Sequence, residues 1–478
     1  MKTRRLYDAA LFAAFGVASA ILLPGPALAA ATASGFDGSA LGLAWVLPFA
    51  GILLSIALFP LVAPMFWHHH FGKISLFWAL AFLVPFALQF GPEITLHEVL
   101  HTALLEYIPF IILVGALFTI AGGIYVGGNL HGSPVLNTAL LAIGMVLASF
   151  VGTTGASMVM IRPVLRANDD RVHNVHVVVF FIFLVSNIGG SLTPLGDPPL
   201  FLGFLKGVDF FWPLQFLWAK MLIVSAILLG VFFLLDWYLY VKEGRVKDPT
   251  PDKPVYLRGL INVPILVVLV LTVLASGSLP SIGAVSIYDI KVEGLNIARE
   301  AILIGLALLS LRLTSQACRV GNEFNWGPLI EVAKLFAAIF ITIIPAIAIL
   351  RAGQNGELAP LLAAVTGPDG QPDNAAYFWL TGVLSSFLDN APTYLVFFNA
   401  AGGDPVQLMG SLATTLAAIS AGAVFMGANT YIGNAPNFMV KAIAEQQGVR
   451  MPSFFGYMGW SLIFLIPCFF FVTVLFFL

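Results

Sequence analysis

The sequence predicts an all-α polytopic membrane protein with two inverted-topology repeats and about ten membrane-spanning helices. Three observations predict this fold class. The 478 residues are 59% hydrophobic and only 10% charged, with a mean hydropathy of +0.95, which is more apolar surface than one soluble core can bury. Apolar runs about 20 residues long, the length that crosses a bilayer, recur along the chain. A polar pattern rich in glycine and proline occurs twice in the same register.

The repeated pattern occupies two stretches that are 237 positions apart. Ser149 and Ser386 are separated by this offset, and Asp197 aligns with Asn434 at the same offset. The identical pairs in the ungapped register are Leu147/Leu384, Ser149/Ser386, Phe150/Phe387, Gly190/Gly427, Thr193/Thr430, Gly196/Gly433, Pro199/Pro436 and Phe201/Phe438. Polar, broken segments at corresponding places in two apolar halves predict the binding site of a secondary transporter.

The amino-terminal residues 1–30 are typical of a secretory signal peptide. Residues 2–5 are basic in part, residues 9–23 are apolar, and residues 27–29 form a small-residue cleavage site. A retained first helix is the alternative interpretation. Both interpretations place the residues near Ala40 outside the cytoplasm.

The first half, residues 40–240, is expected to contain four complete spans, a hairpin and a broken helix. The spans are predicted at about 40–66, 73–90, 102–125 and 212–240. Residues 134–168 are too short for two spans of about 20 residues each and are interrupted at positions 152–155. They predict a re-entrant helical hairpin with its tip at membrane depth. The next helix, residues 174–207, is predicted to break at 193–199.

The second half, residues 259–478, is expected to repeat this order in the opposite orientation. The loop at 241–258 links the halves, and its excess of basic over acidic residues predicts a cytoplasmic location. A hairpin is predicted at 377–400, a broken helix at 406–446 and a last span at 455–478. Counting crossings from the linker opens the first hairpin to the cytoplasm and the second to the other side. The two tips are then expected to meet near the midplane.

Hydroxyl and amide side chains concentrate at the two tips and the two breaks. Unwound backbone within a membrane needs protein or a water-filled cavity to satisfy its polar groups, so these segments are expected to line a site. Their oxygens are the hard ligands that small cations prefer, whereas the half-helix N-termini beside them favour an anion. The candidate ligands are Ser149, Thr153, Thr154, Thr193, Ser386, Asn390, Asn429, Thr430 and Asn434.

Two carboxylates, Asp197 in the first break and Asp389 at the second tip, favour a cation. An ionised acid costs at least about 2.5–3.5 kcal/mol at membrane depth. The two breaks contain no lysine or arginine to offset it. We expect each acid to hold either a proton or Na⁺, which is the minimal chemistry of an antiporter. The alternative is that Asp197 and Asp389 only cap the helices that follow them.

Glu106 and Glu331 occupy similar positions near the starts of two helices. A proton-relay role is one interpretation of both residues, and an interfacial position is the other. Lys334 follows Glu331 by one helical turn, which predicts a local ion pair.

The segments Ser386-Phe387-Leu388-Asp389-Asn390 and Thr193-Pro194-Leu195-Gly196-Asp197 resemble the ion transporter superfamily. Within it, the chain resembles NhaD-type sodium/proton antiporters and the neighbouring citrate-transporter families. The resemblance implies a scaffold and a transport domain in each protomer, a homodimer, and elevator-like movement of the hairpin-bearing domain. It also implies that the two aspartates, with Asn390, Ser386 and Thr193, bind the cation. NhaD-type proteins also tend to carry an Asp-Asn pair at the first tip, where this chain has Gly152-Thr153-Thr154, so the number of bound cations stays open.

These features together predict a secondary transporter of the bacterial inner membrane that exchanges Na⁺ or Li⁺ for protons. The alternative is a Na⁺- or H⁺-coupled citrate or dicarboxylate transporter. No cofactor is expected, and the net charge of −2 gives no basic field for nucleic acid. Cys318 and Cys468 predict neither a disulfide nor a metal site. An intramembrane hydrolase is disfavoured because the sequence lacks Gly-x-Ser-x-Gly and because an enzyme would not need the duplicated pattern, although His97-Glu98-Val99-Leu100-His101 does match HExxH.

Overall fold

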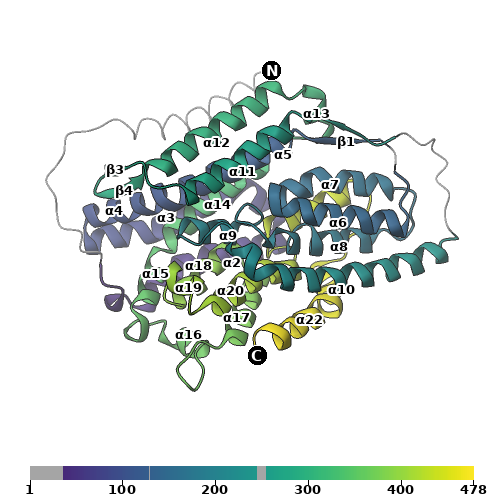
Figure 1. The fold of residues 1–478 in the computed structure, drawn as a ribbon. Helices are drawn as coiled ribbons and strands as arrows, with labels where there is room; N and C mark the ends of the chain where they lie inside the picture. The colour runs from purple at the N-terminus through teal and green to yellow at the C-terminus, as the bar shows by residue number, and fades with distance from the viewer. Residues whose placement is uncertain (1–35, 129, 245–253) are drawn as a thin grey trace. The chain divides into compact units, whose positions relative to one another are not determined.

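The computed structural model describes residues 36–478, except residue 129 and residues 245–253. The predicted signal peptide at 1–30 lies outside this described part of the chain. The described chain is predominantly helical, with two short two-stranded sheets (Figure 1). Strand β1 (Tyr125–Gly127) pairs antiparallel with β2 (Tyr256–Arg258), and β3 (Ala284–Ile287) pairs with β4 (Ile290–Glu293).

The described residues contain eight helices that are long and apolar enough to cross a membrane, which confirms the predicted all-α polytopic membrane fold. They include α2 (Leu47–Val62), α3 (Pro64–Phe90), the continuous α4 (Pro92–Thr102), η3 (Ala103–Tyr107) and α5 (Ile108–Ala121), α10 (Trp212–Lys242), α12 (Gly294–Leu313), the consecutive α14 (Gly327–Thr342) and α15 (Ile344–Arg351), and α22 (Phe454–Phe476). The shorter apolar helix α11 (Asn262–Ser278) lies beside α12 (Figure 1). The remaining short elements are α13 (Gln316–Gly321), α16 (Ala359–Ala364), α19 (Pro405–Met409), η1 (Gly38–Ala40), η2 (Leu43–Val46) and η5 (Gly353–Asn355).

Two spans begin earlier than predicted. The second starts at Pro64 rather than at 73, and the third starts at Pro92 rather than at 102. Both prolines stand in the first turn of their helix, where a missing backbone N–H costs nothing. The polar residues that follow each proline hid these starts from a search for apolar runs.

Each half contains a helical hairpin. The first consists of α6 (Pro134–Val151) and α7 (Thr153–Ala167), and the second of α17 (Asn374–Phe387) and α18 (Asn390–Ala400). Helices α7 and α18 begin 237 positions apart, at residues 153 and 390, so the sequence register is also a structural register. The second hairpin starts three residues before the predicted position 377, because the Asp373 side chain accepts from the Ala376 N–H at 2.9 Å and caps α17 there.

Each half also contains a broken helix. The first runs through α8 (Val175–Leu184), η4 (Ile188–Ser191) and α9 (Pro198–Leu205). The second runs through α20 (Ala413–Met426), η6 (Gly427–Asn429) and α21 (Ala435–Gln446). The second broken helix does not start at the predicted position 406, since α19 is a separate short helix that ends at Met409.

The hairpins and broken helices pack crosswise. Helix α7 of the first hairpin contacts α21 of the second broken helix, and α18 contacts α9. The helices of the two hairpins and the two broken helices, with α10 and α22, form what we call the core bundle. Helices α2 to α5, α11, α12 and α14 pack against one another and form the flanking bundle. The two bundles meet where α5 contacts α7 and α9.

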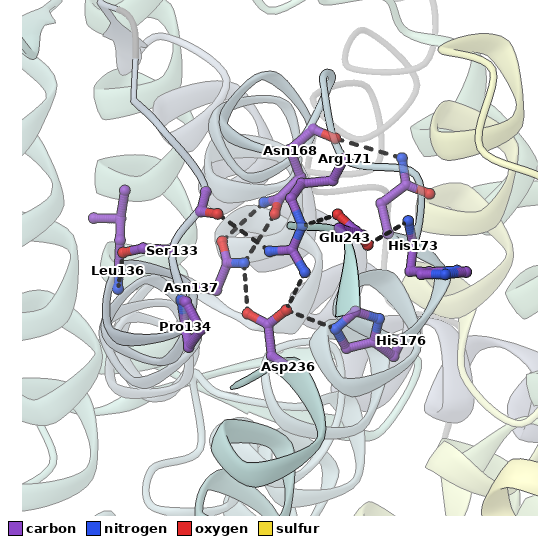
Figure 2. Close-up of polar contacts among 12 residues, drawn as sticks. Ser133, Pro134, Leu136, Asn137, Asn168, Arg171, His173, His176, Asp236 and Glu243 are labelled. Atoms are coloured by element: carbon purple, nitrogen blue, oxygen red, sulfur yellow. Dashed lines mark hydrogen bonds and ion pairs between the residues drawn. The ribbon is translucent and has the colours of Figure 1, made fainter. Parts of the chain in front are cut away.

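A buried polar cluster holds the open end of the first hairpin (Figure 2). Asn137 on α6 and Asn168 after α7 exchange two amide hydrogen bonds of 2.8 Å. Asp236 on α10 accepts from Asn137 Nδ2 at 2.9 Å and from Arg171 Nη2 at 2.8 Å, and it lies 2.9 Å from His176 Nε2. These contacts fix the open end of the hairpin to α8 and α10. Helices α6 and α7, which carry the tip at their other end, are therefore anchored there.

Candidate functional site

Asp197 is the meeting point of the two halves. Its side chain, 2% exposed, precedes α9 but makes no capping hydrogen bond to that helix. The carboxylate instead accepts from Thr153 Oγ1 at 2.8 Å, from Asn434 Nδ2 at 3.1 Å and from Asn390 Nδ2. Three polar groups from three separate segments therefore converge on one acid, and a purely capping role for Asp197 does not fit this geometry.

The groups around Asp197 form two repeat-related pairs. Thr153 and Asn390 are 237 positions apart and bind the two oxygens of the same carboxylate. Asp197 and Asn434 are also 237 positions apart and hydrogen-bond directly to each other. The relation between the two repeats thus places Asp197 opposite Asn434, and only one member of this pair is an acid.

Four hydroxyls from the predicted set, two in each half, bind the tips to the breaks. Ser149 Oγ donates to the Gly189 carbonyl at 2.5 Å, and its counterpart Ser386 donates to the Met426 carbonyl at 3.0 Å. Thr193 Oγ1 donates to the Ser149 carbonyl. Its counterpart, Thr430 Oγ1, donates to the Ser386 carbonyl in the same way. The structure therefore places these hydroxyls in matched tip-to-break contacts, beside the pocket rather than on its wall.

A small pocket lies in front of Asp197. Its polar lining residues are Thr153, Thr154, Asp197, Asp389 and Asn434. Apolar walls come from α5 and α14 of the flanking bundle and from Phe201 on α9. The volume is about 60 Å³, which is room for a few water molecules or a small ion. No lysine, arginine or histidine is among its lining residues.

Asp389 reaches this pocket from the second tip. Its carboxylate accepts from the Ala391 N–H at 3.1 Å and caps α18. A capping role is thus present, but one N–H uses only a small part of the acceptor capacity of a carboxylate. The rest of the side chain is directed at the same cavity as Asp197.

Two buried amide oxygens have no hydrogen-bond donor within the described residues. They are Oδ1 of Asn390, whose Nδ2 is bound to Asp197, and Oδ1 of Asn429, whose Nδ2 donates to Ser386 Oγ at 2.9 Å. Each amide is oriented by its nitrogen, so its oxygen is held with free lone pairs. Buried acceptors without donors are rare, and a cation is one species that would satisfy them.

Glu106 and Glu331 do not line the pocket. Glu106 forms an ion pair with Lys206, which directly follows α9. Glu331 lies close to Trp67 and His68. The expected pair between Glu331 and Lys334 is absent from the described ion pairs, since Lys334 Nζ lies 5.3 Å above the Phe71 ring. Lys334 therefore contacts Phe71 on a neighbouring helix instead of Glu331. Spacing along one helix could not predict this contact.

Two asparagines bridge the breaks and were not predicted. Asn187 Nδ2 donates to Asn437 Oδ1 at 2.7 Å, and Asn434 Nδ2 lies 3.3 Å from Asn187 Oδ1. Asn437 Nδ2 in turn donates to the carbonyls of Gly427 and Thr430. Neither Asn187 nor Asn437 has a polar counterpart 237 positions away, so the repeat comparison passed over them. The signal that could have found Asn187 is its place at the end of a long apolar run.

Known proteins of similar sequence are transporters by name. The chain is 25% identical over 378 residues to the uncharacterized transporter Mb2703 of Mycobacterium bovis, covering 75% of this chain and 83% of that protein. The uncharacterized transporter Rv2684 of Mycobacterium tuberculosis gives the same values. The uncharacterized transporter slr0753 of Synechocystis is 24% identical over 319 residues, covering 62% and 66% of the two chains. Residues 38–477 match the family described as "Putative citrate transport", and the chain is a multi-pass membrane transporter that belongs to this family.

Proposed function

We propose that the protein is an antiporter that exchanges Na⁺ or Li⁺ for protons across a bacterial inner membrane. One observation carries the proposal: Asp197 and Asp389 line the same pocket, and no cationic side chain lines it. Two neighbouring carboxylates without a basic partner need either protons or a metal cation to be stable at membrane depth. Competition between these two occupants couples the flow of one to the flow of the other.

The ligands available to the cation are oxygen atoms only. The two carboxylates would supply charge. The free Oδ1 atoms of Asn390 and Asn429 are neutral groups of the kind that small hard cations accept, but neither residue lines the pocket. Thr153, Asn390 and Asn434 hold Asp197 in place.

The distribution of charge supports a cytoplasmic location for the mouth of the first hairpin. Basic residues gather at this mouth and at the segments joined to it. They are Arg162, Arg166, Arg171, Lys242, Arg258 and Arg319. With inverted repeats, the second hairpin then opens to the outer side. We infer inverted repeats, a homodimer and movement of the core bundle past the flanking bundle on the basis of the resemblance.

A citrate or dicarboxylate transporter is the second candidate. The description of the matched family favours it. Helices α7, α9, α18 and α21 also begin at the tips and breaks, and their positive N-terminal ends favour anions. Against it, a carboxylate substrate would meet two acids and no cationic side chain in a pocket of about 60 Å³.

Transport by purified protein in proteoliposomes distinguishes the candidates. Vesicles would carry an internal pH dye and an imposed proton gradient, and Na⁺, Li⁺, K⁺ or citrate would be added in turn. Dissipation of the gradient by Na⁺ or Li⁺ without citrate is expected for the antiporter. Uptake of labelled citrate driven by Na⁺ or H⁺, with no response to cations alone, would overturn the proposal in favour of the second candidate. Empty vesicles and the Asp197→Asn variant set the background rate.

A further inference from the structure

Two buried asparagines join the two breaks, and neither of them lines the ion pocket. Asn187 lies between α8 and η4 in the first break, and Asn437 lies on α21, directly after the second break. Both residues are fully buried. An amide is stable in an apolar bundle only where its oxygen and its N–H groups are paired. Asn187 and Asn437 meet this requirement through hydrogen bonds whose direction is set by backbone carbonyls.

Two carbonyls fix the direction of the Asn437 amide. Its Nδ2 donates to the carbonyl oxygens of Gly427 and Thr430, at 2.8 and 2.9 Å. A carbonyl can only accept, so the nitrogen of the amide must face these two groups and Oδ1 must face away from them. Oδ1 of Asn437 therefore accepts from Asn187 Nδ2, at 2.7 Å.

The direction of the Asn187 amide is fixed in the same way. Its Nδ2 donates to the Ile182 carbonyl at 2.8 Å as well as to Asn437. Both hydrogens of the amide are thus used, and Oδ1 faces Nδ2 of Asn434 at 3.3 Å. Gly427 makes room for this oxygen, because a Cβ at that position would lie 3.1 Å from Asn187 Oδ1. The first break therefore presents an acceptor to Asn434.

Asn434, which lines the pocket, is the last amide of this chain of bonds. Three acceptors surround its Nδ2, namely the Ser186 carbonyl at 3.1 Å, Asn187 Oδ1, and Asp197 Oδ1 at 3.1 Å. A reversed amide would place its oxygen against these three oxygens, which is unfavourable at a buried site. The nitrogen is therefore held on Asp197. Oδ1 of Asn434 accepts no hydrogen bond within the described chain, so its lone pairs are available to a cation.

We propose that Asn187 and Asn437 are positioning residues for the ion site, which hold the Asn434 amide with its nitrogen on Asp197 and its oxygen towards the cation. Groups that orient a metal ligand without touching the metal typically change metal affinity by about 10- to 100-fold when they are removed. The same bonds join the two breaks, so the ligand from the second half keeps its place beside the acid from the first. The inference rests on the proposed function, because it takes the occupant of the pocket to be a cation.

The Na⁺ dependence of exchange in proteoliposomes tests this assignment. Asn187→Ala should raise the Na⁺ concentration for half-maximal exchange about tenfold and leave the maximal rate within about twofold of the parent. A merely structural role would reduce the amount of folded protein without changing this concentration. Asn437→Ala should act in the same direction. The double variant should raise the concentration by less than the product of the two single effects, because both residues act through one chain of hydrogen bonds.

A matched control is Asn262→Ala in the flanking bundle. Asn262 is also fully buried and does not line the pocket. Its amide is bonded at both ends, since Nδ2 donates to the Gly259 carbonyl and to Thr314 Oγ1, and Oδ1 accepts from Ser310 Oγ. This variant should lower the melting temperature as Asn187→Ala does, but it should keep the parent's Na⁺ concentration for half-maximal exchange.

A parent-like Na⁺ dependence in Asn187→Ala, or an equal rise in Asn262→Ala, would overturn the assignment. Asn187→Thr replaces the alanine variant if that variant does not fold, because threonine nearly preserves the volume while its single hydroxyl cannot bridge Asn434 and Asn437. The same rise is expected of it. A parent that does not respond to Na⁺ but takes up labelled citrate would refute the proposed function instead. The assignment is then tested on the citrate concentration for half-maximal uptake, since Asn434 and Asp197 line the pocket for either substrate, and a parent-like value in Asn187→Ala would overturn it.

Discussion

The two hairpin tips occupy equivalent positions but have different backbones. Gly152, with φ 80° and ψ 152°, lies in a region that is essentially restricted to glycine. Its counterpart 237 positions later is Asp389, with φ −58° and ψ 138°, a conformation open to any residue. An acid at the first tip would strain the chain, whereas an acid at the second tip fits. The backbone therefore explains why the Asp-Asn pair is present at one tip only.

The two breaks show the opposite relation. Asp197 and Asn434 share nearly the same backbone, with φ −148° and −151° and ψ 145° and 140°. They differ only in having a carboxylate or an amide, and they bond to each other at 3.1 Å. Each half thus supplies one acid, from its break in the first half and from its tip in the second. Both acids therefore line a single pocket, instead of each repeat forming a pocket of its own.

The largest expected effect comes from Asp197→Asn. The variant removes the charge that three donors surround, and its own amide N–H₂ would face the amide donors of Asn390 and Asn434. We expect Na⁺-driven proton movement in proteoliposomes to fall at least about 100-fold, about 2.8 kcal/mol in transition-state terms. Size-exclusion chromatography and a thermal melt would verify that the protein is still folded.

A swap of the two groups sharpens this comparison. The double variant Asp197→Asn/Asn434→Asp keeps one acid and one amide in the same bonded pair, on nearly the same backbone. If the two-fold relation is functional, the swap should recover about tenfold over Asp197→Asn alone. An unchanged rate in Asp197→Asn would remove Asp197 from the ion site altogether.

Asp389→Asn is expected to have a smaller effect. Asparagine caps a helix as well as aspartate does, so α18 should keep its stability while the pocket loses one charge. We expect an increase of about 10- to 30-fold in the Na⁺ concentration for half-maximal exchange, corresponding to about 1.4–2 kcal/mol. The control is Asp404→Asn, since Asp404 caps α19 through the Val406 N–H at 2.9 Å outside the site. Equal affinity for Na⁺ in both variants would reduce Asp389 to a cap.

The repeat register made much of the site predictable from sequence. The offset between Ser149 and Ser386 reappears in the starts of α7 and α18 and in matched hydrogen bonds from hydroxyl to carbonyl. Tips and breaks carry glycine, proline and polar residues because unwound backbone in an apolar setting requires them. This requirement is local, so it is visible along the chain.

Contacts between segments far apart in the chain could not be predicted in the same way. Asn187 and Asn437 meet although they lie 250 positions apart and have no repeat-related counterparts. Lys206 follows a helix of the first half, and nothing near it in sequence indicates Glu106 as its partner. Pairing of this kind depends on how the bundles pack, which periodicity does not encode. The extra turns of α3 and α4 were missed for a simpler reason, because their polar residues resemble a loop.

Gly152→Asp tests the backbone account of the first tip. An aspartate forced into this conformation should lower the free energy of unfolding by about 1–3 kcal/mol. An added Cβ would also lie 3.3 Å from the Leu195 carbonyl oxygen. Thermal denaturation in detergent, compared with Gly305→Ala in an ordinary helical position with open space around it, measures the difference. A Gly152→Asp protein as stable as the parent would mean that sequence history, not strain, removed the acid.

The smallest expected effect separates the two serines that fasten the tips. Ser149 donates to one carbonyl, that of Gly189, whereas the single O–H of Ser386 is shared between two carbonyls and its oxygen accepts from Asn429 Nδ2. Ser149→Ala should therefore destabilise the protein by about 1 kcal/mol and Ser386→Ala by about 2 kcal/mol, since the second also leaves a buried amide donor unpaired. Thermal melts with and without Na⁺ would measure both. Equal losses would mean that the Asn429 contact contributes nothing, and the two tips would then differ in their acid alone.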